Sequence, residues 1–409
     1  MDTGQLQVNI VSFADGSVVQ NATVSIAVTG QPDSIVMQVI TGISGQTEKV
    51  TLDTPDLELS LSPGVIQPYS EYNITITAPG FETYIVNAAQ ILPGETAVLN
   101  VRLIPQANNQ SAELFVIPPH TLFGDYPPRE LESEIKPINE SGEIVLSRVV
   151  IPEYVVVHDG PPSDSSANNY YVPYKDYIKN VASNEIYATW PEATIIANIL
   201  AIQSFTLNRV YTEWYRNRGY DFTITSSTAV DQKWVPERNI FQNISDIVDS
   251  IFTNFLSRPN VSQPILTQYC DGRRVTCPQV MSQWGSKDLG DRGYTAVEIL
   301  KYYYGDSIYI NETEVISGIP SSWPGYNLEI GSRGDKVRQL QSQLNTIATA
   351  YPLVPKIAAD GIYGPATAEA VRVFQSIFSL GQTGITDFPT WYKISEIYVG
   401  VSKIGEYYN

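Results

Sequence analysis

Cysteine and histidine are scarce in this chain, whose 409 residues include only Cys270, Cys277, His120 and His158. A structural zinc site needs four such ligands, and these positions are too scattered in the sequence to predict one. We therefore expect no metal and no cofactor. The same scarcity disfavours a serine triad, or a nucleophilic pair of Cys277 with His158. Cys270 and Cys277 are close enough for a local disulfide, although two reduced thiols fit the sequence equally well.

Long apolar runs are also missing. No uninterrupted run approaches the roughly 20 residues that a membrane span needs, so the sequence predicts no span. The first residues, Met1 to Gly4, lack the basic start and the apolar stretch of a signal peptide. Either the numbering begins after processing, or export follows another route, or the protein is made in the compartment where it acts.

Basic residues are outnumbered, since 25 Lys and Arg face 43 Asp and Glu and the net charge is −18. Residues 1–149 hold 17 acidic and 5 basic residues, whereas residues 150–409 hold 26 and 20. Nucleic-acid binding depends on clustered Lys and Arg, so this balance argues against DNA or RNA as a ligand. Binding of an anionic glycan would have to come from grooves and hydrogen bonds.

The first hundred residues contain short alternating strands. Apolar and polar side chains alternate in four stretches, at residues 6–11, 22–28, 72–77 and 97–103. Short strands at this spacing predict a β-sandwich. Their order, the turn at Asp15-Gly16 and the later segment Tyr72 to Phe81 are similar to the carboxypeptidase-regulatory or transthyretin-like sandwich. Residues 1–106 hold no catalytic constellation, so we expect a binding or shielding domain.

The next stretch, residues 107–149, is rich in proline and acidic residues. Its members include Pro118, Pro119, Pro127, Pro128, Glu130, Glu132, Glu134 and Glu140. Such a composition favours an extended, accessible linker that a protease could cut. The end of this stretch, Ser141 to Pro152, is partly apolar and also fits a strand packed on the following domain.

A helix with an inward carboxylate is predicted after residue 172. Ile178, Val181 and Ala182 form an apolar stripe at helical spacing, and Glu185 follows Val181 by four residues and Ile178 by seven. We therefore expect the Glu185 side chain to point inward. Residues 172–209 resemble the opening motif of the catalytic domain of stage II sporulation protein D, in which a Val-Pro-x-x-Asp-Tyr start precedes a glutamate, Trp-Pro and an Ala-rich helix.

A second match to the same family lies about a hundred residues later. The segment beginning at Met281 reads Met-Ser-Gln-Trp-Gly, and the segment beginning at Gly293 reads Gly-Tyr-Thr-Ala-Val-Glu-Ile-Leu-Lys-Tyr-Tyr-Tyr-Gly. Two matches in sequence order imply an α+β catalytic domain over residues 150–318. In that family the glutamate cleaves peptidoglycan glycan strands, and Glu185 is its counterpart here.

The same resemblance suggests substrate-binding residues. Ser282, Gln283 and Trp284 belong to the second motif, and an amide beside an aromatic ring suits the N-acetyl group and the face of a sugar. Trp284 also fits a core anchor. Gln203 is a further candidate, because it stands where the family has an arginine.

The C-terminal residues 319–409 carry a third motif. Residues 328–341 read Leu-Glu-Ile-Gly-Ser-Arg-Gly-Asp-Lys-Val-Arg-Gln-Leu-Gln, and residues 360–375 begin Asp-Gly-Ile-Tyr-Gly-Pro. Asp335 is expected to cap one helix and Pro365 to start a second. The pattern resembles the small three-helix peptidoglycan-binding module found on many cell-wall hydrolases.

The order of sandwich, linker, catalytic domain and wall-binding module resembles that of clostridial spore-cortex-lytic enzymes of the SleC type. This implies an inactive precursor in the cortex or coat region of the dormant spore, from which a subtilisin-like germination protease removes the N-terminal part. We place the cut within Leu146, Ser147, Arg148, Val149 and Val150. The active form would be a lytic transglycosylase acting on cortex peptidoglycan, for which one buried carboxylate suffices.

Two alternatives stay open at the level of the sequence. One is an N-acetylmuramoyl-L-alanine amidase, which normally needs zinc and which the shortage of histidine disfavours. The other is a non-catalytic wall-binding scaffold in which Glu185 is structural. Analysis of the chain ends released from cortex separates anhydro-muramic ends, new free amines and no product.

Overall fold

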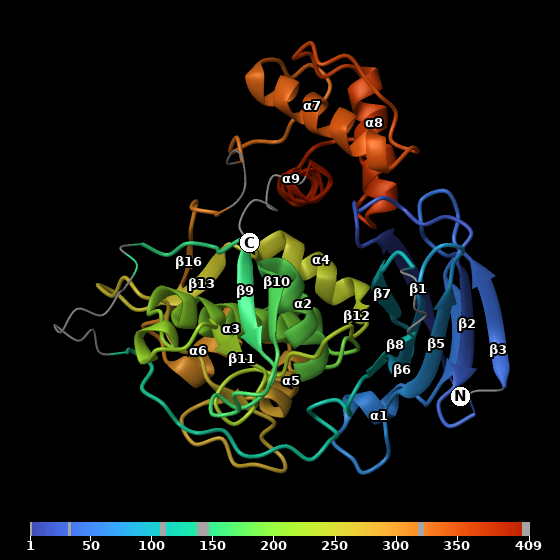
Figure 1. The fold of residues 1–409 in the computed structure, drawn as a ribbon. Coiled ribbons are helices and arrows are strands. Elements are labelled where there is room, and N and C mark those ends of the chain that lie inside the picture. The colour runs from blue at the N-terminus through green and yellow to red at the C-terminus, as the bar shows by residue number, and fades with distance from the viewer. Residues whose placement is uncertain are drawn as a thin grey trace.

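The computed structural model describes residues 2–31, 34–106, 112–136, 146, 148–317 and 323–402, and only the backbone of Val399 and Ser402. The chain forms a sheet-rich N-terminal part, a central part of helices with small sheets, and a C-terminal group of helices (Figure 1). The expected multidomain character, with strands at the N-terminal end and helices at the C-terminal end, is confirmed.

Two sheets make up the N-terminal part, in the orders β12-β7-β1-β4 and β3-β2-β5-β6-β8. The alternating stretches form strands as expected, since Tyr72, Ile74 and Ile76 of β5 are buried while their neighbours are not. The strand bounds are β1 (Asp2–Ser12), β2 (Thr23–Val28), β3 (Ile35–Ile40), β4 (Val50–Thr54), β5 (Ser70–Thr77), β6 (Thr83–Ile91), β7 (Thr96–Leu103) and β8 (Ala112–Val116).

One strand of the first sheet comes from the central part. β12 (Ile240–Phe241) pairs antiparallel with β7, with Ile240 opposite Val98 and Phe241 opposite Ala97. A short helix of the N-terminal part, α1 (Glu58–Leu61), also reaches the central part, because the Trp190 indole donates to the Ser60 carbonyl over 3.0 Å. The sandwich is therefore joined to the central part by main-chain pairing as well as by side chains.

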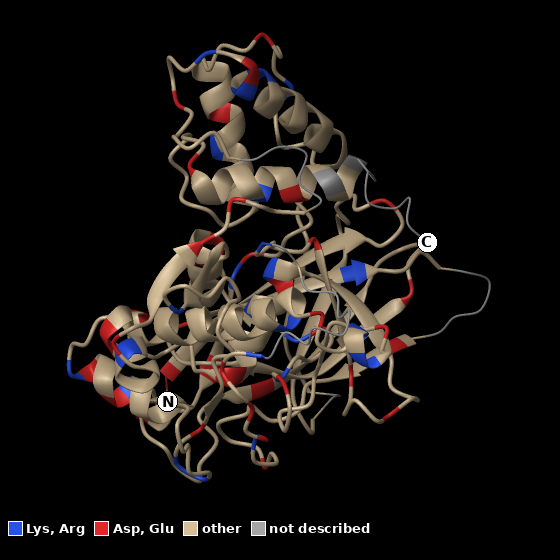
Figure 2. Cartoon of the chain, turned by 90° about the vertical axis from the view of Figure 1, so that its left-hand side faces the viewer, with Lys and Arg blue, Asp and Glu red and all other residues tan. Residues whose placement is uncertain are grey.

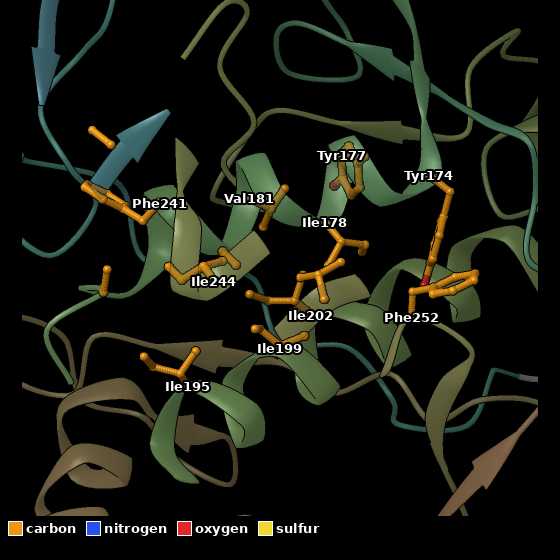
Figure 3. Close-up of a cluster of buried hydrophobic side chains, with 14 of the residues drawn as sticks. Tyr174, Tyr177, Ile178, Val181, Ile195, Ile199, Ile202, Phe241, Ile244 and Phe252 are labelled. Atoms are coloured by element: carbon orange, nitrogen blue, oxygen red, sulfur yellow. The ribbon is translucent and has the colours of Figure 1, made fainter. Parts of the chain in front are cut away.

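The central part is built around one buried helix, α3 (Glu192–Tyr211), of which 17 of 20 residues are buried. Figure 3 shows Ile178 and Val181 of α2 beside Ile199 and Ile202 of α3. The other helices are α2 (Tyr174–Glu185), η1 (Arg216–Arg218), α4 (Gln242–Ile251), α5 (Gln283–Asp291) and α6 (Ala296–Tyr304). Three small sheets contain β9 (Tyr154–His158), β10 (Asn169–Pro173), β11 (Ile224–Thr225), β13 (Asn254–Ser257), β14 (Tyr269–Cys270), β15 (Met281–Ser282) and β16 (Tyr309–Glu312).

The C-terminal helices are α7 (Asp335–Ala350), α8 (Pro365–Ile377) and α9 (Phe388–Ser402). Pro365 begins α8 as predicted. The predicted cap at Asp335 is wrong, because Gly334 holds the cap position and no side chain caps the helix. Asp335 is instead the first helical residue, and its carboxylate pairs with Arg338 over 2.9 Å.

Residues 117–136, which we call the strap, cross the central part along the teal trace at the bottom of Figure 1. The accessible linker expected here is wrong for these residues. Glu132 pairs with Arg209 of α3, and both Glu134 oxygens accept from Arg258 over 2.7 Å. Backbone bonds continue the contact, with the Leu266 N–H donating to the Glu134 carbonyl over 2.8 Å. The acidic residues that indicated a solvated linker therefore have partly buried basic partners.

The cleavage region is described at four of its five residues, and Ser147 lies outside the described residues, as does the stretch 137–145. Arg148 is exposed and Val150 is partly buried. The Leu146 N–H donates to the Tyr211 carbonyl, and the Val149 carbonyl accepts from the Thr313 hydroxyl over 2.6 Å. Both ends of the region are thus attached to the central part.

A buried ion cluster attaches the C-terminal helices to the central part. Asp249 of α4 accepts from Lys175 over 3.0 Å and from Lys179 over 2.7 Å, and Lys175 also pairs with Glu396 of α9 over 2.8 Å. Although burial raises the pKa of Asp249, the two lysines bring it well below its ordinary value. Glu396 pairs in turn with Lys393 over 3.1 Å.

Figure 2 shows basic residues beside acidic ones in the central part and on the C-terminal helices. Within residues 2–31 and 34–106 of the sandwich, by contrast, Lys49 and Arg102 are the only basic residues. Among the described helices, none has the length and apolarity needed to cross a membrane.

We predict that Asp249→Asn destabilises the protein by about 3–5 kcal/mol, since it leaves two buried ammonium groups with less compensating charge. Urea unfolding followed by circular dichroism measures the change in the free energy of unfolding. The control is Glu369→Gln, which breaks the exposed pair with Arg372 and should cost less than about 1 kcal/mol. Equal, small effects of the two substitutions would contradict a stabilising role for the cluster.

Candidate active site

Glu185 is the last residue of α2, and its side chain is only 4% exposed. The stripe of Ile178, Val181 and Ala182 is fully buried, so the inward direction predicted for Glu185 is what the structure has. The helix ends because Ile186 turns to an extended conformation, with φ −138° and ψ 153°. The carboxylate therefore stands at the end of a buried helix.

Three donors from three separate segments hold this carboxylate. Oε1 accepts from the backbone N–H of Lys233 over 3.0 Å, and Oε2 accepts from Gln283 Nε2 over 3.1 Å. Oε2 also lies 3.3 Å from the Thr121 hydroxyl, which shares its one hydrogen with the Asn184 carbonyl at 2.6 Å. Gln283 Nε2 also donates to the Glu185 carbonyl over 2.8 Å. Buried carboxyl oxygens need hydrogen-bond partners, and these three segments supply them to Glu185.

Lys233 also places a cation near the carboxylate. Burial lowers the pKa of its ammonium group, and the charges of Asp159 and Glu185 act in the opposite direction. The ammonium lies 5.7 Å from the centre of the Tyr126 ring, which belongs to the strap. This residue was not found from the sequence.

A cavity of about 150 Å³ opens in front of Glu185. One wall is the strap, another is the loop from Tyr269 to Val275, and Gln283 lies beside Glu185. The lining residues are Thr121, Asp125, Tyr126, Pro127, Pro128, Arg129, Glu185, Thr228, Tyr269, Cys270, Asp271, Arg274, Val275 and Gln283. The strap therefore narrows the space around the carboxylate.

The loop that forms the second wall is closed by a disulfide between Cys270 and Cys277, whose Cα atoms lie 5.8 Å apart. Gly272 allows the loop to approach β15, since its φ is +77° and a Cβ there would lie 1.8 Å from Ser282 Oγ. Asp271 stabilises the turn by accepting from the backbone N–H of Val275 over 3.0 Å and from Arg274 Nε over 2.9 Å.

The other predicted binding residues do not line this cavity. Ser282 caps α5 by accepting from the Gly285 N–H over 2.9 Å. Trp284 is 2% exposed, and its ring centre lies 4.9 Å from that of Trp190. Gln203 is fully buried on α3, where its amide donates to the Ile251 carbonyl over 2.9 Å. Of the predicted residues, the structure brings only Gln283 to Glu185.

Both histidines are buried at other places. His120 lies in the strap, with its ring centre 4.4 Å from that of Tyr187 and 6.4 Å from that of Tyr69. His158 stacks on Phe222 and bonds Asn169 over 2.9 Å. Across the described part of the chain, no three His, Cys, Asp or Glu side chains gather into a group that could hold a metal.

Comparison with known families identifies the C-terminal helices. Residues 333–394 match the family model of a putative peptidoglycan binding domain, so this part of the expectation is confirmed. The match supports peptidoglycan as a partner of the chain. The zinc D-Ala-D-Ala carboxypeptidase of Streptomyces albus G is 40% identical over 77 residues, which are 19% of this chain and 28% of that protein. The chain thus spans under a third of that relative's length.

Solved structures overlap about a quarter of the chain. The 5-hydroxyisourate hydrolase of Klebsiella pneumoniae is 16% identical, covers 25% of this chain and 92% of its own, and gives a TM-score of 0.17. The TIE protein of Bacillus anthracis is 15% identical, covers 26% of this chain and 17% of its own, and gives a TM-score of 0.18. TM-scores of this size do not establish a shared fold.

We predict that Gln283→Leu lowers the free energy of unfolding by about 1–3 kcal/mol, because it removes a donor from a buried carboxylate and from a buried carbonyl. Urea unfolding gives the value. Gln242→Leu is the matched control, since its amide bonds the exposed Asp246 carboxylate over 2.7 Å and should change little. A Gln283 variant as stable as the control would contradict the positioning role.

Proposed function

We propose that this chain is the precursor of a peptidoglycan lytic transglycosylase, of the spore-cortex-lytic SleC type, that cleaves the bond between N-acetylmuramic acid and N-acetylglucosamine. The observation that supports the proposal most directly is one buried carboxylate, Glu185, facing a cavity in a chain that also carries a peptidoglycan-binding domain. The second family motif supplies Gln283, which positions that carboxylate.

The reaction needs one group that first gives and then takes a proton. Glu185, protonated, would donate its proton to the glycosidic oxygen as the bond from that oxygen to C1 breaks. The same carboxylate would then accept the proton of the C6 hydroxyl of the muramic residue while that oxygen bonds C1. The product is a 1,6-anhydro ring, the carboxyl proton is restored, and no water is consumed.

The surroundings of the other acids support a single-carboxylate mechanism. Asp125 and Asp271 share the cavity, and Asp125 belongs to the strap, which leaves the site in the proposed active form. Asp271 accepts from Arg274 and from backbone N–H groups, and although burial raises its pKa these bonds bring it below its ordinary value. Asp176 is at the first turn of α2, lining a different cavity. Hydrolysis with two carboxylates needs a second acid free to activate water or attack C1.

The strap supports the assignment of an inactive precursor. It forms one wall of the cavity, and its Thr121 hydroxyl bonds Glu185 directly. A cut within residues 146–150 by a subtilisin-like protease would break the covalent link between the strap and the central part, so that the strap and the sandwich could then dissociate. In this proposal the protein waits in the cortex or coat region of the spore and acts on cortex peptidoglycan during germination.

We predict that Glu185→Gln abolishes anhydro-muramic products, with a rate loss of about 10²–10⁴-fold or more, because an amide cannot transfer the proton. The test uses the full chain with a specific protease sequence in place of residues 141–145, cut and incubated with purified cortex. Mass spectrometry of released muropeptides is the readout. Glu192→Gln, at the exposed start of α3, is the matched control and should retain activity.

Products that persist in the Glu185 variant would move the active site elsewhere in residues 150–315. New free amines in place of anhydro ends would indicate an amidase. No product from the cut parent would favour a wall-binding scaffold in which Glu185 is structural.

We also predict that the uncut chain is much less active than the same chain after cutting, because the strap occupies one side of the cavity. Both forms come from one preparation, so the comparison needs only protease and a mock digest. Equal rates of product release would reject the precursor assignment while leaving the reaction itself in place.

A further inference from the structure

The side chain of Arg274 donates hydrogen bonds in two directions, to Asp271 of its own loop and to Thr121 and Gly124 of the strap. On the protein side, its Nε donates to Asp271 over 2.9 Å, inside the loop closed by Cys270 and Cys277. On the strap side, Nη1 donates to the Gly124 carbonyl and Nη2 donates to the Thr121 carbonyl. The guanidinium is therefore fixed in direction by its own loop, and its outward donors are used by the strap.

The same strap residue connects the guanidinium to the proposed catalytic carboxylate. Thr121 gives its carbonyl to Arg274 and its hydroxyl to Glu185, and all three residues line one cavity. The strap turn is tightly packed at this point, because a Cβ on Gly124 would lie 2.8 Å from the Tyr126 ring. Arg274 itself is 41% exposed, so it stands at the open side of the cavity.

These contacts describe a site that receives acyl oxygens. Two amide carbonyls meet the two terminal nitrogens of a guanidinium, which is always charged and prefers paired oxygen acceptors. A peptidoglycan strand presents the same chemistry in its N-acetyl amides and in its lactyl carbonyls and carboxylates. The carbonyl oxygens of Thr121 and Gly124 would then occupy the positions beside Glu185 that acyl oxygens of the glycan strand take in the active form.

We infer that Arg274 is a substrate-binding residue, which binds acyl oxygens of the glycan strand once the strap segment Thr121–Gly124 has left. This inference rests on the proposed function for the reaction, but it concerns binding and has a separate readout. It also assigns Thr121 and Gly124 as the groups that substrate displaces.

We therefore expect Arg274→Gln to raise the activity of the uncut chain and to weaken substrate binding by the cut chain. In the cut chain, loss of the charged donors should raise the KM for soluble glycan strands about 10- to 100-fold and change kcat little. In the uncut chain, the same substitution releases the strap and should raise activity above that of the uncut parent. A residue that only clamped the strap would show the second effect and leave the cut enzyme unchanged.

The experiment measures both forms of the full chain carrying the protease sequence at residues 141–145. Arg273→Gln is the matched control, because Arg273 is the neighbour of Arg274 in the sequence and its side chain pairs with Asp288, outside the cavity, over 2.9 Å. Arg274→Lys tests charge without the paired geometry and should lie between the parent and the Gln variant. Thr121→Val should raise activity of the uncut chain, because it removes the strap hydroxyl that contacts Glu185. Thermal unfolding of each variant verifies that it folds.

Binding is measured in the Glu185→Gln background by isothermal titration of the cut chain with two probes. One is a muropeptide tetrasaccharide, and the other is chitotetraose, which carries N-acetyl groups without lactyl groups. Weaker binding of both probes by Arg274→Gln assigns Arg274 to an N-acetyl oxygen, and weaker binding of the muropeptide alone assigns it to a lactyl oxygen.

The outcomes separate this inference from the proposed function. A cut chain that releases no products but loses muropeptide binding with Arg274→Gln would keep the binding role and reject the reaction. A cut chain that releases anhydro products with the same KM and the same affinity in Arg274→Gln as in Arg273→Gln would overturn the inference and leave the reaction in place. Loss of binding equal in both arginine variants would also overturn it.

Discussion

The buried carboxylate of Glu185 is the constraint on which the rest of the site depends. A carboxyl group taken out of water must find hydrogen-bond partners in the protein, and here they lie in the strap, in the backbone at Lys233 and in Gln283 of α5. These segments are 48 to 98 residues from Glu185 in sequence, so the fold has to bring them together before the carboxylate is satisfied.

The same requirement shapes the scaffold around the site. Arg209 is buried on α3 between Asp231, at 2.8 Å, and the strap residue Glu132. Its burial lowers the pKa of the guanidinium, and these carboxylates outweigh that effect and raise it. One of its two counter-charges therefore belongs to the strap. The ion pair between Arg209 and Glu132 therefore joins two residues that lie on opposite sides of the proposed cut at residues 146–150.

Patterns set by regular periodicity were predictable from the sequence. The alternation of β5 and the stripe on α2 each follow from local geometry, and the stripe was enough to place Glu185 inward. Gln283 was predicted from a motif together with Ser282 and Trp284, and of these three only Gln283 lines the cavity. Successive residues on a helix point about 100° apart, so adjacent residues in a motif face different surroundings.

Contacts between segments that are distant in the sequence could not be predicted from periodicity. Proline and glutamate in the strap have the composition of a solvated linker, and only the presence of Arg209 and Arg258 on the facing surface turns them into a packed segment. Thr121 and Arg274 belong to no periodic pattern in the sequence, and their roles follow from the hydrogen bond that joins them in the structure. The backbone N–H of Lys233 is invisible in any residue pattern.

The strap's contacts also determine what a proteolytic cut can achieve. A cut breaks one peptide bond and leaves every ion pair and hydrogen bond of the strap unchanged, so it does not by itself open the cavity. Its effect is to convert an intramolecular segment, present at a high effective concentration, into one that can be diluted away. Under the proposed function, substrate would then compete with the strap for Arg274 and Glu185. A glycan strand anchored by the C-terminal module has its own high local concentration, which favours it in that exchange.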